Sequence, residues 1–256
     1  VHNKGFVRLV DYMGGDDRIV QAARVSYGSG TKTVREDAAL IDYLLRNEHT
    51  SPFEQVVLTF HVKMPIFVAR QWIRHRTARL NEISGRYSVM KDEFWLPEPQ
   101  ALALQSKDNK QGRQEESLPP EQAAAVIQKL EAGQKEAYAQ YKALVDSGLA
   151  RELARVNLPL SMYTEWYWQM DLHNLFRFLA LRLDGHAQKE IRDYAKVLLD
   201  ICAVVAPMAT ASFKSNLLGG ARLNASELQA VKAMLAGGES GLSGRELERL
   251  QEKLGL

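Results

Sequence analysis

Positions 55–65 read Gln55-Val-Val-Leu-Thr-Phe-His-Val-Lys-Met-Pro65 and indicate a β-strand that passes directly into a helix. β-Branched and aromatic side chains prevail in the first ten residues, which is typical of strands. Pro65 suits the first turn of a helix, because the N–H that proline lacks would have no partner there. We therefore predict a strand over residues 55–64 and a helix that starts at Pro65.

The predicted helix has two sides of different chemistry. At helical spacing its apolar side chains face a core, while polar and basic side chains share another side. The apolar set is Ile66, Phe67, Val68, Trp72 and Ile73, and the polar set is Arg70, Gln71, Arg74 and His75. The chain is then expected to enter a loop, in which Gly85 predicts a turn into another strand.

Further elements extend outward from this strand and helix. We predict a short strand over residues 5–10 and helices over residues 16–25, 33–46, 120–147, 151–157, 172–184 and 187–205. Residues 105–117 are almost wholly polar and lack periodicity, so we interpret them as a mobile loop and a candidate active-site lid. The predicted fold class is α+β, a β-sheet flanked by long α-helices.

The last part of the chain is predicted to be a short helical extension. It spans residues 219–256, after a main domain over residues 1–218. Two N-terminal capping patterns indicate two helices there, Asn224 with Glu227 and Ser243 with Glu246.

Composition limits the class of protein. The chain has 256 residues, of which 46% are hydrophobic and 25% charged, enough for one sizeable core. Its net charge of +2 does not indicate general nucleic-acid binding. The apolar run around residues 197–206 is interrupted by Asp200, and no leader pattern opens the chain, so we expect a soluble, cytoplasmic protein without a membrane span.

Cys202 is the single cysteine, which excludes an intrachain disulfide and a multi-cysteine metal site. Its apolar neighbours predict a buried small side chain and not a reactive thiolate. No pattern of histidines, cysteines or carboxylates has metal-ligand spacing, so no metal is predicted.

Basic and polar side chains gather in Arg74-His-Arg-Thr-Ala-Arg-Leu-Asn-Glu-Ile-Ser-Gly-Arg-Tyr87. Arginine offers a planar fork of donors that matches carboxylate or phosphate oxygens, so this mixture indicates an anion held in one orientation. Ser84 could be a nucleophile, but no elbow motif supplies a base, which favours a hydrogen-bonding role. Residues 49–55, with Ser51 and Glu54, could be no more than a turn before the strand.

A second segment places charged groups among apolar ones, over residues 168–188. By themselves, Asp171 and Asp184 could form ordinary helix-surface ion pairs with His173, Arg177 or Arg182, each worth ~0.2–0.5 kcal/mol.

The two segments together resemble the flavin-dependent thymidylate synthases. Arg74-His75-Arg76, seven further residues and then Ser84-Gly85-Arg86-Tyr87 are similar to the family signature, and Arg182 followed four residues later by His186 is similar to its second functional region. Asp171-Leu172-His173 stands where familiar members have Asn-Ala-Arg, and both Asp171 and His173 retain hydrogen-bonding groups. The resemblance covers about residues 5–215.

The resemblance implies a set of site residues and ligands. Those it implies for FAD are Ser26, Ser51, Glu54, Arg74, His75, Arg76, Glu82, Asp171, His173, Arg177 and His186. Those it implies for the nucleotide dUMP are Gln71, Arg74, Glu82, Ser84, Gly85, Arg86, Arg155 and Arg182. It also implies NADPH and 5,10-methylenetetrahydrofolate as co-substrates, and a homotetramer with shared active sites.

The implied chemistry is the reductive methylation of dUMP to dTMP without a cysteine nucleophile. Reduced flavin can deliver hydride after the one-carbon unit is transferred. Arg182 is then expected to stabilise negative charge on the pyrimidine, and Ser84 to orient the substrate. Arg155 is expected to act on a nucleotide held by the Ser84–Arg86 loop of another chain. The alternative is an RNA- or nucleotide-binding module without catalysis, which would show steep salt dependence and no bound chromophore.

Overall fold

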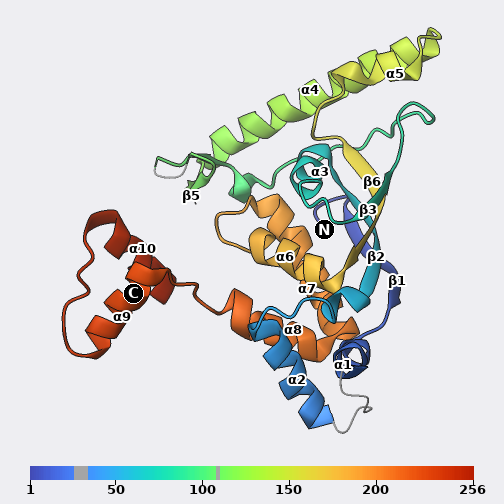
Figure 1. The fold of residues 1–256 in the computed structure, drawn as a ribbon. Helices are drawn as coiled ribbons and strands as arrows, with labels where there is room; N and C mark the ends of the chain where they lie inside the picture. The colour runs from blue at the N-terminus through green and yellow to red at the C-terminus, as the bar shows by residue number, and fades with distance from the viewer. Residues whose placement is uncertain (26–33, 108–109) are drawn as a thin grey trace. The chain divides into compact units, whose positions relative to one another are not determined.

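Four antiparallel strands form the main sheet of the computed structural model, in the order β1-β2-β6-β3 (Figure 1). The structure describes residues 1–25, 34–107 and 110–256, and it divides into two compact units, Val1–Thr210 and Ala211–Leu256. The strands are β1 (Phe6–Met13), β2 (Val57–Pro65), β3 (Arg79–Glu82) and β6 (Tyr163–Asp171). The predicted α+β class is confirmed.

The centre of the sheet is the pair β2 and β6. Nine residues of each strand pair in antiparallel register, from Val57 opposite Asp171 to Pro65 opposite Tyr163. Sequence reasoning missed β6, although its side chains alternate: Trp166, Trp168 and Met170 are buried on one face of the sheet. This pairing brings two segments that are far apart in the sequence into one core.

Three helices lie against the face of the sheet that carries the tryptophans (Figure 1). They are α3 (Ile66–Trp72), α6 (Leu172–Arg182) and α7 (Lys189–Val205). Trp72 is fully buried between them, with its ring centroid 5.2 Å from that of Trp168 and 4.9 Å from that of Phe178. Aromatic contacts of this kind contribute stability beyond the burial of apolar area.

The strand-to-helix junction follows the prediction with two corrections. Pro65 is the last residue of β2 and the N-cap of α3, and not part of its first turn. Ile73 was expected in the core but is 39% exposed, because α3 ends at Trp72 and the side chain leaves the helical pattern there.

Helices α1 (Asp16–Arg24), α2 (Val34–Arg46) and α8 (Pro207–Phe213) pack near the end of β1. Asp16 connects two of them, since its carboxylate accepts hydrogen bonds from the backbone N–H groups of Met208 and Ala209 at 2.7 and 3.0 Å. Arg24 and Asp37 form an ion pair at 2.8 Å between α1 and α2.

A long arm begins with α4 (Pro120–Asp146), as predicted for this region (Figure 1). Gly148 follows with φ of +85°, a conformation that favours glycine and ends the helix. The helix expected over residues 151–157 consists of α5 (Arg151–Ala154) and the 3₁₀ turn η4 (Arg155–Asn157). The arm is packed by a small cluster of Met90, Phe94, Tyr141, Ala154 and Met162.

Residues 105–117, which we interpreted as a mobile loop, include a strand, β5 (Arg113–Ser117). It pairs with β4 (Ala103–Gln105), which follows η3 (Pro99–Ala101), and the three elements form the 99–117 hairpin. The Gln105 side chain donates to the carbonyls of Lys110 and Gly112 at 3.2 and 2.7 Å, which links the end of β4 to the residues just before β5. The structure likewise gives a strand, β3, before Gly85 and not after it, because Ser84–Ser88 form a turn.

The unit Ala211–Leu256 contains η5 (Lys214–Leu218), a π-helical turn, followed by α9 (Ala225–Leu235) and α10 (Gly244–Leu254). The capping box predicted at Asn224 and Glu227 is present. The one predicted at Ser243 is wrong, because the Ser243 side chain makes no capping hydrogen bond. In the described ranges no helix is both long and apolar enough to span a membrane.

Candidate active site

The end of α3 and the end of α6 meet at His75 and Arg182. Arg182 Nε donates a hydrogen bond to His75 Nε2 at 3.0 Å, and Arg182 Nη2 donates to the Gln71 carbonyl at 3.4 Å. The His75 ring also lies edge-on to Phe178, with centroids 4.7 Å apart. Both partners of Arg182 were predicted site residues, and the fold brings them together from positions more than one hundred residues apart in the sequence.

His75 must be neutral to accept that hydrogen bond, because a protonated imidazole only donates. Burial and the charges of Arg182 and Arg177 lower the pKa of His75 to about 4. The hydrogen bond from Arg182 therefore places the single imidazole proton on Nδ1. At physiological pH the neutral His75 ring holds the Arg182 guanidinium at its Nε atom, so that the Nη1 group stays available to a ligand.

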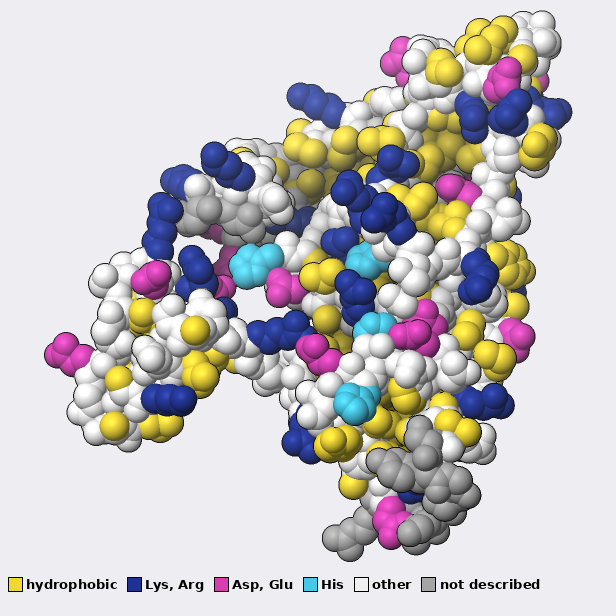
Figure 2. Space-filling model, viewed as in Figure 1, with side chains coloured by type: hydrophobic (Ala, Val, Ile, Leu, Met, Phe, Trp, Pro, Cys, Tyr) yellow, Lys and Arg dark blue, Asp and Glu magenta, His cyan; other side chains and the backbone are white. Residues whose placement is uncertain are grey.

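The same region gathers positive charge without carboxylate partners. Burial and the nearby charge of Arg74 lower the pKa of Arg182. Within the described ranges, no carboxylate forms an ion pair with Arg74, Arg177 or Arg182. Figure 2 shows Lys, Arg and His side chains gathered on one face of the Val1–Thr210 unit. A partly buried Arg182 beside the exposed Arg74 and Arg177 fits an anionic ligand such as a phosphate.

A second cluster forms around the turn at Ser84. Ser84 Oγ accepts the Arg86 N–H at 3.2 Å, and the Arg86 side chain pairs with Glu152 at 3.0 Å. Gly85 is buried, and a Cβ added there would lie 3.1 Å from Cδ of Arg155. The Ser84–Arg86 loop and Arg155 are thus neighbours within one chain, whereas we expected Arg155 to approach the loop of another chain.

β3 separates the two clusters. His75 precedes this strand and Ser84 follows it, and four extended residues span roughly 13 Å. Glu82 lies at the end of β3, where its carboxylate accepts the Thr164 hydroxyl at 2.5 Å. Each chain therefore presents two groups of site residues that are held apart by a strand.

The remaining sequence-predicted residues lie at several places. Ser51 precedes η2 (Phe53–Gln55), and Glu54 within it accepts from Thr50 Oγ1 at 2.9 Å, so these residues do form a turn before the strand. His186 bonds to Asp184 at 2.9 Å. Asp171 caps α6 by accepting from the Asn174 N–H at 2.9 Å. Arg76 and Arg177 are exposed, His173 is half-buried, and Ser26 lies outside the described residues.

Sequence reasoning missed several residues that contact the predicted ones. Gln188 accepts a hydrogen bond from the Gln71 side chain, Phe178 packs on His75, and Thr164 binds Glu82. Arg151 donates to the Tyr87 carbonyl at 3.1 Å. Each is one of several similar residues nearby in the sequence, and only the tertiary fold distinguishes it.

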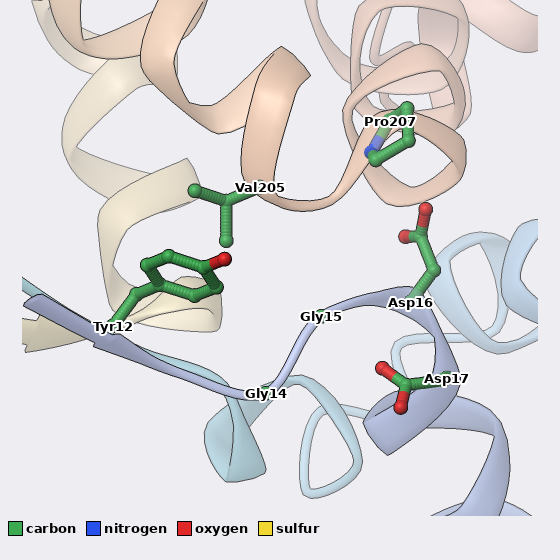
Figure 3. Close-up of a pocket in the computed structure, with 7 residues that line it drawn as sticks. All are labelled: Tyr12, Gly14, Gly15, Asp16, Asp17, Val205 and Pro207. Carbon is green, nitrogen blue, oxygen red and sulfur yellow. The ribbon is translucent and has the colours of Figure 1, made fainter.

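A hollow elsewhere in the Val1–Thr210 unit holds none of these residues (Figure 3). It lies where β1 gives way to α1, and it is lined by Tyr12, Gly14, Gly15, Asp16, Asp17, Val205 and Pro207. The Asp16 carboxylate there is already occupied by the backbone of α8. The candidate active site is therefore the arginine-rich region and not this hollow.

Known proteins are similar over nearly the whole chain. Residues 8–208 match the family described as "Thymidylate synthase complementing protein", and residues 221–255 match "Thymidylate synthase ThyX C-terminal domain". A flavin-dependent thymidylate synthase of Treponema denticola is 67% identical over 99% of this chain and 96% of its own. One from Thermus thermophilus is 57% identical over 99% and 94%.

A solved structure has the same fold. It is a UMP/dUMP methylase, PolB, from Streptomyces cacaoi bound with 5-Br dUMP, with a TM-score of 0.77 and 32% identity. The likeness covers 84% of this chain and 96% of that one. By the family match and by these relatives, the chain belongs to the flavin-dependent thymidylate synthases.

Proposed function

We propose that this chain converts dUMP to dTMP, with 5,10-methylenetetrahydrofolate as the one-carbon donor and NADPH-reduced FAD as the hydride source. The observation that carries the proposal is the Arg182–His75 pair, which joins the two sequence segments of the family signature. The names of the relatives and the 5-Br dUMP in the solved structure support the same substrate.

FAD fits the charge of the region. Arg74, Arg76 and Arg177 would face its phosphates, and the half-buried His75 ring, which packs on the buried Phe178, would lie beside a flat ring. When bound and reduced, the flavin supplies the hydride. Ser26, Ser51, Glu54, Asp171, His173 and His186 are proposed as supporting contacts.

Arg182 would stabilise negative charge that develops on the uracil ring. The Nε atom is occupied by His75, so the orientation of the guanidinium is set before substrate binds. A preorganised cation needs no rearrangement in the reaction step. Such a donor is worth ~3–4 kcal/mol of transition-state stabilisation.

The nucleotide phosphate would lie at the second cluster. The Ser84 hydroxyl and the Arg86 and Arg155 side chains would supply the donors around buried Gly85, while the Arg86 N–H is already bonded to Ser84 Oγ. Because β3 separates this cluster from Arg182, we propose that one dUMP is bound by the two clusters of different copies in a homotetramer.

No cysteine takes part in the proposed reaction. Cys202 is fully buried in α7, and burial raises the pKa of its thiol to about 12. A buried, un-ionised thiol is a poor nucleophile, which supports a reaction without a cysteine nucleophile.

The experiment is a test for bound flavin and for product. The purified protein is expected to show the absorbance of oxidised flavin and to form dTMP from dUMP, methylenetetrahydrofolate and NADPH. Cys202→Ala should retain turnover as a control. A protein that takes up no FAD and forms no dTMP would remove the enzyme proposal and leave the RNA-binding alternative, which predicts binding that weakens steeply with salt.

A further inference from the structure

An ion pair joins the hairpin of residues 99–117 to the first turn of α7. Arg113, the first residue of β5, donates from Nη2 to Glu190 Oε1 at 2.9 Å. Arg113 Nη1 donates to the Ala101 carbonyl at 2.7 Å. One guanidinium therefore holds both the base of the hairpin and the start of the helix.

The acidic partner is buried. Glu190 is 3% exposed, whereas the Arg113 side chain is 34% exposed. Among the described residues, no donor reaches Glu190 Oε2. A buried carboxylate with a single side-chain donor depends on that donor, because removing it would leave a desolvated charge without compensation.

The first turn of α7 also reaches the candidate active site. Gln188 is the N-cap of α7, two positions before Glu190, and its side-chain oxygen accepts a hydrogen bond from Gln71 Nε2. The Gln71 carbonyl accepts from Arg182 Nη2 at 3.4 Å. The side chain of Gln71 is thus bonded to the helix that Arg113 holds, and its carbonyl is bonded to Arg182.

We propose that Arg113 and Glu190 are positioning residues, which hold the first turn of α7 so that Gln188 keeps Gln71 oriented toward the nucleotide. The inference rests on the proposed function, in which Gln71 contacts dUMP. It also assigns a role to the 99–117 hairpin, which would hold the first turn of α7 in place beside the site through Arg113.

A contribution to stability alone would lower the melting temperature and leave the affinity for dUMP unchanged. A positioning role acts through Gln188, so it has a signature of its own. If Arg113 works only through Gln188, removing both should weaken dUMP binding no more than removing Gln188 alone.

The experiment is a double-mutant cycle with the flavin-loaded enzyme. Arg113→Gln, Gln188→Ala and the double variant are compared by KM and kcat for dUMP and by calorimetric titration with dUMP. Loss of one neutral hydrogen bond is worth about 1 kcal/mol, so KM should rise about fivefold in each single variant with kcat nearly unchanged. The double variant should match Gln188→Ala.

Two further variants provide control and rescue. Lys189→Ala removes an exposed pair with Asp193 on the same turn and should leave KM unchanged. Arg113→Lys keeps the cation, loses the planar guanidinium and should restore part of the affinity for dUMP. It also serves if Arg113→Gln does not fold.

Trypsin should cut after Lys107 and Lys110 faster in Arg113→Gln than in the wild type, a measurement that does not require enzyme activity.

The proposal is overturned if KM for dUMP is unchanged in Arg113→Gln, or if the effects of Arg113→Gln and Gln188→Ala simply multiply. A wild-type protein that neither binds dUMP nor forms dTMP would instead overturn the proposed function. Faster cleavage with normal dUMP binding would assign the ion pair to hairpin stability alone.

Discussion

Arg182 is bonded at its Nε atom to a neutral histidine, and the neutrality of this partner leaves the charge of the guanidinium uncompensated. A carboxylate at the same place would neutralise the guanidinium, whereas an imidazole acceptor orients it and leaves its charge available to a ligand. Neutrality of His75 is secured by burial and by the cations Arg182 and Arg177. The residue therefore acts as an uncharged support in a region of positive charge.

The stability of the fold should depend on pH through His75. Its pKa is lowered to about 4, against an ordinary value of 6.5, so the unfolded chain binds a proton between pH 6.5 and 4 that the folded chain does not. Stability is expected to fall as pH falls through this window. His75→Gln, which cannot titrate, should lose less free energy of unfolding between pH 7 and pH 4.5 in denaturant titrations. Equal losses in both proteins would contradict this account.

Ser84 and Arg182 should differ in what their removal costs. Ser84→Ala removes a neutral hydroxyl whose loss costs on the order of 1 kcal/mol, while Arg182→Ala removes a preorganised cation worth ~3–4 kcal/mol in the reaction step. Single-turnover oxidation of the reduced flavin is the measurement. Near-normal rates for Arg182→Ala, with complete loss for Ser84→Ala, would reverse the two roles.

At the scale of elements, periodic apolar patterns predicted the helices well. The helix predicted over residues 120–147 corresponds to Pro120–Asp146, and the one over residues 16–25 to Asp16–Arg24. The 99–117 hairpin was not predictable from periodicity, because β4 has only three residues, β5 is polar and largely exposed, and both are held by backbone pairing and by Gln105. β6 had a signal in its alternating tryptophans, which was passed over in favour of the charged residues that follow it.

The candidate site was predictable in type but not in arrangement. The resemblance of two sequence segments to a known family implied roles for Arg74, His75 and Arg182, whereas the contacts among them depend on how α3 and α6 meet. The position of Arg155 beside Gly85 shows the same limit, because a loop and a distant helix are brought together by the arm that carries α4. The implied roles of the individual site residues stay predictions.

The helices of the Ala211–Leu256 unit offer a matched test of capping. The Asn224 side chain accepts the Glu227 N–H at 2.9 Å, and Glu227 returns a bond to the Asn224 N–H at 2.8 Å. Asn224→Ala should destabilise α9 by about 1 kcal/mol. Ser243→Ala should change α10 much less, since Ser243 makes no side-chain cap. Amide hydrogen exchange within α9 and α10 of the full chain is the measurement, and equal effects at both positions would contradict the assignment.

At the scale of the whole molecule, the main consequence is that the proposed active site is divided. Arg182 and His75 belong to one cluster, Arg86 and Arg155 to another, and β3 lies between them. In the proposed function, neither cluster alone closes one nucleotide off from water. Assembly of several copies is therefore part of the proposed catalytic function and not an accessory to it.

Mixing two inactive variants tests this division. One carries Arg86→Ala with Arg155→Ala, and the other carries Arg182→Ala. If sites combine clusters from different copies, random mixing should leave roughly a quarter of the sites with a full set of residues. Activity should then exceed that of either variant alone. No recovery, despite subunit exchange proven by mass spectrometry, would place both clusters at one site within a single chain.

The pairing of β2 with β6 also has a consequence for how the chain acquires its structure. The innermost pair, Pro65 with Tyr163, closes a loop of roughly one hundred residues. Closing this loop lowers the conformational entropy of the chain before the contacts between the strands can offset that cost. During synthesis β1 and β2 can pair early. The other edge of β2 has no partner until β6 has left the ribosome. In that interval the unpaired backbone N–H and C=O groups of β2 can pair with other chains, and refolding at high protein concentration should favour aggregation over recovery.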